Sequence, residues 1–154
     1  MNRQMQLVRA VALKADAFYG TAEKFGARMA RPFSHEHGHE RGRAQITGLE
    51  AIANSALKAS DVLDYVKKQT ARHEEWYKDN LGPDLLSFLT DGGPDSLYKQ
   101  RGAIEKSLSL DAVERQQVTV MLYREFIRQV AAHYQFEQRR LQQERAKNES
   151  VSRG

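Results

Sequence analysis

The chain has 154 residues, a formal net charge of +4, 29% charged and 40% hydrophobic residues, and no cysteine. This length suits one domain that can bury a core of its own. The composition excludes disulfides and thiolate metal sites, and no apolar run approaches the roughly 18 residues that a membrane span needs.

The basic charge is concentrated toward the two ends of the chain. Residues 1–43 carry 8 Lys/Arg against 4 Asp/Glu, residues 44–108 carry 8 against 10, and residues 109–154 carry 8 against 6. Both ends can therefore face a polyanion, whereas the middle cannot do so uniformly. The first residues lack the continuous apolar stretch and the cleavage site of a signal peptide, so we expect a cytoplasmic protein without membrane contact.

The spacing of apolar residues predicts helices along the whole chain. Residues 3–30 and 44–58 repeat apolar side chains at helical intervals. Ser60 is the expected N-cap of a third helix, and shorter helices are expected after Pro83 and Pro94. No alternating apolar and polar run is long enough for a strand.

The last helix is predicted to be capped by Ser109 and to run from Leu110 to about Lys147. Between residues 118 and 134 this helix is apolar around most of its circumference, which is typical of the central helix of a bundle. Its two expected apolar stripes are Val113, Val120, Ile127, Tyr134 and Leu141, and Val118, Leu122, Phe126, His133 and Phe136.

These patterns together predict the fold class. We expect an all-α, single-domain bundle of five or six helices with a long C-terminal helix. The helical domain spans residues 1–147 and includes a His-rich loop at 31–43, and residues 148–154 are expected to be a disordered tail.

The predicted loop carries histidines and arginines. His35, His37 and His39 alternate, and imidazoles so spaced share one face only in an extended segment, so they are weak candidates for metal ligands. We therefore expect no bound metal and no cofactor. Arg41 and Arg43 are candidates for contacts with phosphates.

A second cationic cluster lies in the third predicted helix. Lys67, Lys68 and Arg72 fall within two turns, and Lys68 and Arg72 share a face. Such a cluster indicates either a solvated surface or a strip that contacts phosphates.

Two segments resemble the small subunits of type III CRISPR effector complexes. "GRAQITGLEAIANSA" resembles the start of that family's helical body, where an "S-Q-I-R"-like sequence precedes a helix; here the match is Ala44-Gln45-Ile46, and Thr47 stands where an arginine is often found. "EFIRQVAAHYQFE" is similar to the family's closing helix, which ends in a "V-A-Y-H-K-Y"-like run. The resemblance covers about residues 44–140.

The resemblance implies a non-catalytic, all-helical protein that assembles in several copies. Such subunits stack beside the duplex of guide RNA and target RNA, with other subunits of the effector complex and copies of themselves as partners. Their basic faces touch backbone phosphates and not base edges. The candidate phosphate-contacting residues here are Arg41, Arg43, Lys67, Lys68, Arg72, Arg124 and Arg128.

An enzyme is the alternative. "RQVAAH" fits the Arg-x4-His pattern of the helical HEPN ribonucleases, in which Arg128 and His133 would act on the phosphate without a metal. Five helical steps place the two residues roughly 140° apart, and His133 falls on an apolar stripe, so a structural role competes with this interpretation. A helical protein-interaction adaptor that binds no nucleic acid is the third possibility.

Overall fold

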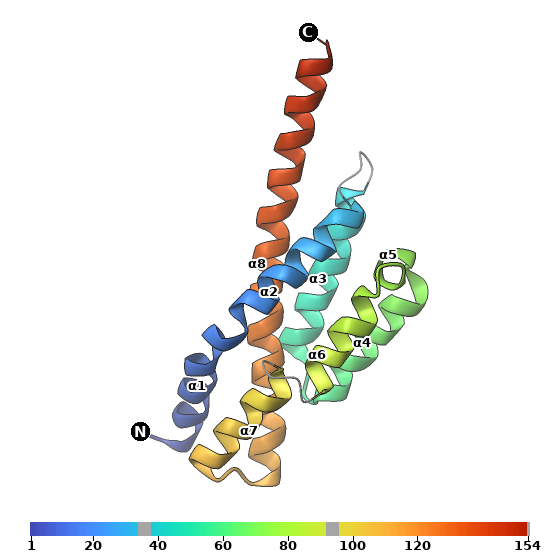
Figure 1. Cartoon of the computed structure of the whole chain (residues 1–154). Coiled ribbons are helices and arrows are strands. Elements are labelled where there is room, and N and C mark those ends of the chain that lie inside the picture. The colour runs from blue at the N-terminus through green and yellow to red at the C-terminus, as the bar shows by residue number, and fades with distance from the viewer. Residues whose placement is uncertain (34–37, 92–95, 154) are drawn as a thin grey trace.

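The computed structural model describes residues 1–33, 38–91 and 96–153, and these ranges are almost entirely helical (Figure 1). The α-helices are α1 (Arg3–Lys14), α2 (Tyr19–Ala30), α3 (His39–Ser55), α4 (Ala59–Arg72), α5 (Glu74–Tyr77), α6 (Leu81–Thr90), α7 (Leu97–Leu108) and α8 (Ala112–Arg153). Two 3-10 segments, η1 (Ala15–Phe18) and η2 (Arg31–Phe33), adjoin α2. The described ranges contain no strand, so the predicted all-α bundle is confirmed.

The number of helical segments in the bundle, counted over the described ranges, depends on how α1 and α2 are joined. The 3-10 segment η1 connects α1 to α2 directly, so the predicted helix at 3–30 is one rod with an interruption. If the single turn α5 is set aside, six rods form the bundle.

The long helix α8 is the centre of the bundle, as predicted. It packs against α1, α2, α3, α4 and α7, and its last turns extend beyond the other helices in Figure 1. Val120, Ile127, Val130 and Tyr134 are all buried. Burying one such side chain contributes about 1.5–3 kcal/mol, so this face of α8 is a large part of the core.

Aromatic rings from several elements meet on α8. The Phe126 ring centroid lies 4.7 Å from that of Phe88, 5.9 Å from that of Phe18 and 6.0 Å from that of Phe25. Edge-to-face and tilted contacts at these distances are favourable for aromatic pairs. The cluster joins η1, α2 and α6 to the middle of α8.

Three predicted boundaries were wrong. The loop expected at 31–43 is shorter, because α3 begins at His39 and places Arg41 and Arg43 in helical turns. The N-cap of α4 is Lys58 and not Ser60. The tail expected to be disordered is helical through Arg153 in the described part of the chain.

The start of α8 also differs from the prediction. Ser109 ends α7 with a left-handed backbone (φ 51°) and does not cap α8. Asp111 takes that place: its Oδ1 accepts the Glu114 N–H at 2.8 Å, and its own N–H donates to Glu114 Oε1 at 3.2 Å. This reciprocal pair is a capping box, and it satisfies two amides of the first turn.

Some apolar residues of the predicted helices face solvent. Val113 is 66% exposed, Phe136 is 71% exposed and Leu57 is 91% exposed. Val113 lies in the first turn of α8, and Leu57 lies in the turn between α3 and α4. Phe136 lies at the edge of a groove, described below.

Candidate nucleic-acid interface

The basic cluster on α4 is exposed. The buried face of this helix carries Val62 and Val66, so packing directs Lys67, Lys68 and Arg72 outward. None of these three cations forms an ion pair with an acidic side chain that the structure describes. Their charges therefore remain available to a polyanion.

The other predicted arginines differ in how far they are engaged. Arg41 forms an ion pair with Glu75 at 2.8 Å, whereas Arg43 is exposed. The Arg124 Nε donates to the Ala53 carbonyl at 3.2 Å, so this side chain links α8 to α3. The seven candidates thus lie on three helices, and Arg124 has a structural contact.

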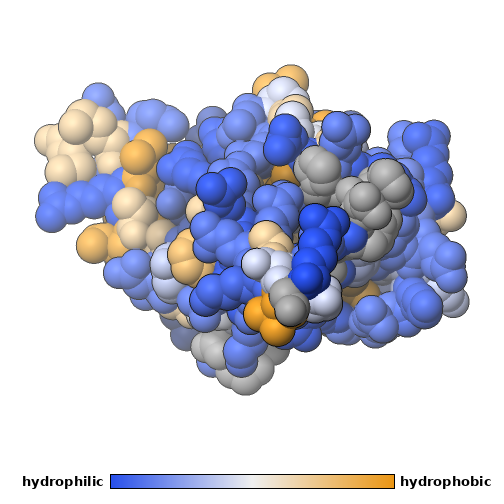
Figure 2. Space-filling model, turned by 90° about the horizontal axis from the view of Figure 1, so that it is seen from above, coloured by the Kyte–Doolittle hydropathy of each residue, from blue (hydrophilic) through white to orange (hydrophobic). Residues whose placement is uncertain are grey.

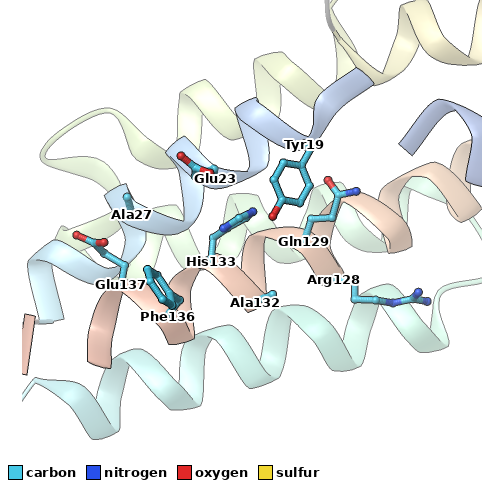
Figure 3. Close-up of a pocket in the computed structure, with 9 residues that line it drawn as sticks. All are labelled: Tyr19, Glu23, Ala27, Arg128, Gln129, Ala132, His133, Phe136 and Glu137. Carbon is cyan, nitrogen blue, oxygen red and sulfur yellow. The ribbon is translucent and has the colours of Figure 1, made fainter. Parts of the chain in front are cut away.

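A groove of about 660 Å³ lies between α2 and α8, and sequence reasoning did not predict it. Figure 3 shows the side chains that line it, from α2 on one side and α8 on the other. The lining residues are Tyr19, Glu23, Ala27, Arg128, Gln129, Ala132, His133, Phe136 and Glu137.

Two polar side chains of the groove have unmet hydrogen-bonding atoms. The His133 ring packs edge-on against Tyr19, with centroids 4.8 Å apart, and its buried Nε2 has no partner in the described part of the chain. The Gln129 Nε2 donates to the Ala15 carbonyl at 3.1 Å, but its buried Oε1 likewise has no partner there. Most buried polar atoms are hydrogen-bonded, so the pair marks a place where a ligand can contribute partners.

The charges of the groove are mixed. Glu137 accepts hydrogen bonds from Arg140 at 2.6 and 3.0 Å, and this contact lowers the pKa of its carboxyl group. Arg128 is 65% exposed and forms an ion pair with Glu125 at 3.1 Å. Glu23 is an exposed carboxylate without an ion pair among the described residues.

Arg128 and His133 both line the groove, but their side chains diverge. In Figure 3 the Arg128 side chain extends along α8 away from the imidazole, which points toward α2 and Tyr19. The two side chains therefore do not point toward one position in the groove.

The structure describes one of the three histidines considered for metal binding. His35 and His37 lie outside the described residues, and His39 begins α3. Over residues 1–33, 38–91 and 96–153, no three His, Cys, Asp or Glu side chains gather in a way that could hold a metal ion.

Two broader observations complete the description of the molecule. None of the helices in the described ranges combines the length and the apolar character that crossing a lipid bilayer requires. Comparison of the chain with protein-family models, with curated proteins and with solved structures found no match.

Proposed function

We propose that this chain is a non-catalytic small subunit of a type III CRISPR RNA-guided effector complex. In this proposal, several copies stack along the duplex of guide RNA and target RNA and contact its phosphates. The observation that carries the proposal is the exposed set of cations on α4, Lys67, Lys68 and Arg72, which form no ion pair with the described acidic side chains.

The chemistry of these cations suits a sequence-independent contact. Point charges on a helix surface neutralise phosphates and release counterions, and they carry no information about bases. The three side chains also lie on a helix whose other face is fixed by Val62 and Val66, so their position is held by the core. Arg43 adds a further exposed cation on α3.

Assembly in several copies would compensate for weak contacts by a single copy. Three or four phosphate contacts per subunit give modest affinity, but linked copies bind with a high effective concentration. We therefore expect weak, salt-sensitive binding by the isolated chain and much tighter binding within a complex. Purification with the products of neighbouring genes should yield RNA and larger subunits together with this chain.

The test is the binding of the full chain to labelled RNA duplexes of fixed length and varied sequence, measured by fluorescence anisotropy at several salt concentrations. The variant Lys67→Glu, Lys68→Glu, Arg72→Glu should weaken binding to every sequence alike and reduce the salt slope by about one per lost phosphate contact. Circular dichroism checks that the variant is folded.

A charge-matched control distinguishes the effect of the α4 cations from the effect of the protein's net charge. Arg9→Glu, Lys99→Glu and Lys106→Glu together reverse the same number of exposed cations on α1 and α7, and we expect them to affect binding much less. Equal loss in both variants, a strong preference for one sequence, or no binding at low salt would contradict the proposal. The last result would leave a protein-interaction adaptor as the better interpretation.

A further inference from the structure

We propose that the groove between α2 and α8 binds one unpaired nucleobase, with Phe136 as the stacking surface and Arg128 and Arg139 as contacts for the flanking phosphates. The inference rests on the proposed function only in taking RNA as the ligand. It adds a site for single-stranded RNA, separate from the duplex-contacting cations of α4.

One strip of α8 combines an exposed ring with cations. Arg128, Ala132, Phe136 and Arg139 follow one another at steps of four, four and three residues, so they lie on one side of the helix. Phe136 is 71% exposed, and both arginines are exposed as well. An exposed aromatic between cations is the pattern of single-strand binding surfaces, where bases stack and phosphates meet the charges.

The second wall of the groove comes from α2. Tyr19 is 49% exposed and is held by its edge-on contact with His133. Ala27 and Ala132 are small, and Figure 3 shows them between the larger side chains, so space remains between the two helices. The volume of about 660 Å³ lies within the range of small-ligand sites and has room for a nucleotide.

The unmet polar atoms match the edge of a base. The buried Oε1 of Gln129 can only accept a hydrogen bond, and the Nε2 of His133 can donate or accept, depending on its tautomer. An unpaired base presents donors and acceptors side by side on its Watson–Crick edge. Both atoms are buried, so an inserted base reaches them once neighbouring side chains such as Tyr19 move aside, and it then gives them the partners that the described residues do not supply.

The charges around the groove favour a neutral base inside it and place phosphates at the arginines of α8. The carboxylates of Glu23 and Glu137 border the groove and oppose a phosphate inside it. Arg128 lines the groove, Arg139 is not among the lining residues, and 11 residues of helix place the two backbones ~16 Å apart along α8. A strand that lies along α8 can therefore place its base in the groove while its backbone meets both cations.

Exposed aromatic side chains also lie outside this groove in the described part of the chain. Figure 2 shows a mostly hydrophilic face with scattered hydrophobic side chains. Tyr77, for example, is 69% exposed on the short helix α5 and does not line the groove between α2 and α8. This makes Tyr77 a suitable control for Phe136.

The experiment measures how the full chain binds a labelled single-stranded RNA and a duplex of the same length. We expect Phe136→Ala to weaken single-strand binding about tenfold, in line with the loss of one stacked base. The salt slope should stay unchanged, because the ring carries no charge. Duplex binding by Phe136→Ala and single-strand binding by Tyr77→Ala should both match the wild type.

A second variant reports stacking directly. The chain has one tryptophan, Trp76, which is fully buried, so Phe136→Trp adds an exposed indole to a constant background. Single-stranded RNA should quench this added fluorescence, and duplex RNA should not. Wild-type affinity of Phe136→Ala for single strands, equal loss with Tyr77→Ala, or an added indole signal in Phe136→Trp that stays unquenched would overturn the inference.

The two proposals can fail independently. Loss of duplex binding in the α4 variant tests the proposed function and involves no groove residue. Retention of single-strand stacking in that same variant would support the groove even if the duplex contact were absent. Loss of self-association in Phe136→Ala, with RNA binding unchanged, would assign the groove to a second copy of the chain and overturn the nucleobase site.

Discussion

Gly26 of α2 lies so close to α8 that a Cβ at this position would be 2.6 Å from the Cβ of His133. The same Cβ would be 2.8 Å from the Tyr134 amide nitrogen and the Val130 carbonyl oxygen. Only glycine allows the two helices to approach this closely. The contact also holds α2 against α8 beside the groove that the two helices line.

Gly26→Ala should therefore destabilise the protein. The added methyl group meets backbone atoms, which cannot move away as a flexible side chain can, so we expect a loss of about 1–3 kcal/mol in the free energy of unfolding. Urea denaturation followed by circular dichroism measures it.

Gly20→Ala is the matched control in the same helix. A Cβ at Gly20 has nothing within 4 Å, so alanine gains helix propensity without a clash and should stabilise by up to about 1 kcal/mol. Equal effects of the two substitutions would show that the close approach of α2 to α8 is wrong.

Ile127→Ala tests the central position of α8. Ile127 is 1% exposed, and its truncation removes apolar contacts and leaves a cavity, so we expect a cost of about 2–5 kcal/mol. Val113→Ala, on the same helix at 66% exposure, should change stability by less than about 0.5 kcal/mol. Denaturant midpoints of the two variants would coincide if α8 were not the core helix.

The helical period in the sequence was enough to predict the centre of the fold. Val120, Ile127 and Tyr134 recur every seven residues, and a face that is continuously apolar must be covered by neighbours. The ends of the helices were predicted less well. Ser109 and Asp111 are both good N-cap residues, and only the backbone of the preceding turn decides between them.

The groove could not be predicted for a different reason. Its walls come from α2 and α8, and the distance between these helices depends on the contact of Gly26 with residues of α8 that lie more than a hundred positions later in the sequence. Periodicity assigned Phe136 to the core, because no pattern within α8 tells where α2 stops covering it. The exposure of the α4 cations was easier to predict from the sequence, because a long charged side chain favours solvent unless it is paired.

The buried contact between Trp76 and Gln45 offers a third test. The indole Nε1 donates to the Gln45 Oε1, and the two residues are 0% and 6% exposed. Gln45→Leu keeps much of the volume but leaves a buried donor without an acceptor, which should cost about 1–3 kcal/mol. Trp76 is the chain's one tryptophan, so its fluorescence reports the change directly.

Gln135→Leu provides the comparison for this substitution, because Gln135 is exposed on α8. The same chemical change there should leave both stability and tryptophan emission close to wild type. A neutral Gln45→Leu would mean that the indole finds another partner.

Alkaline pH should unfold the protein through two buried tyrosines. Burial raises the pKa of the Tyr123 hydroxyl to about 12, with nearby Arg101 acting in the opposite direction, and burial also raises that of Tyr134 to about 12. Their ordinary value is 10.0, so the unfolded chain loses these protons more readily. Their stabilising contribution is therefore complete below about pH 10 and is lost as pH rises toward 12.

Urea denaturation across this pH range, with tyrosinate absorbance recorded in parallel, checks the prediction. Tyr123→Phe also loses the hydrogen bond to the Leu89 carbonyl at 3.0 Å, so only the pH dependence, and not the absolute stability, should be compared. The double variant with Tyr134→Phe should show a shallower loss of stability between pH 10 and 12. An unchanged slope would mean that other groups control alkaline unfolding.

The last prediction concerns the Arg-x4-His motif. His133→Ala should lower stability by about 1 kcal/mol or more, because it removes the edge-on contact of the imidazole with Tyr19. Arg128→Ala should change stability by less than about 0.5 kcal/mol, because it removes only an exposed ion pair with Glu125. Arg128→Ala should also weaken RNA binding modestly.

Wild-type protein incubated with labelled single-stranded RNA, with and without divalent metal, should leave the RNA intact. Cleavage that disappears in Arg128→Ala, and in a His133→Ala variant shown to be folded by circular dichroism, would establish the ribonuclease and exclude the non-catalytic subunit.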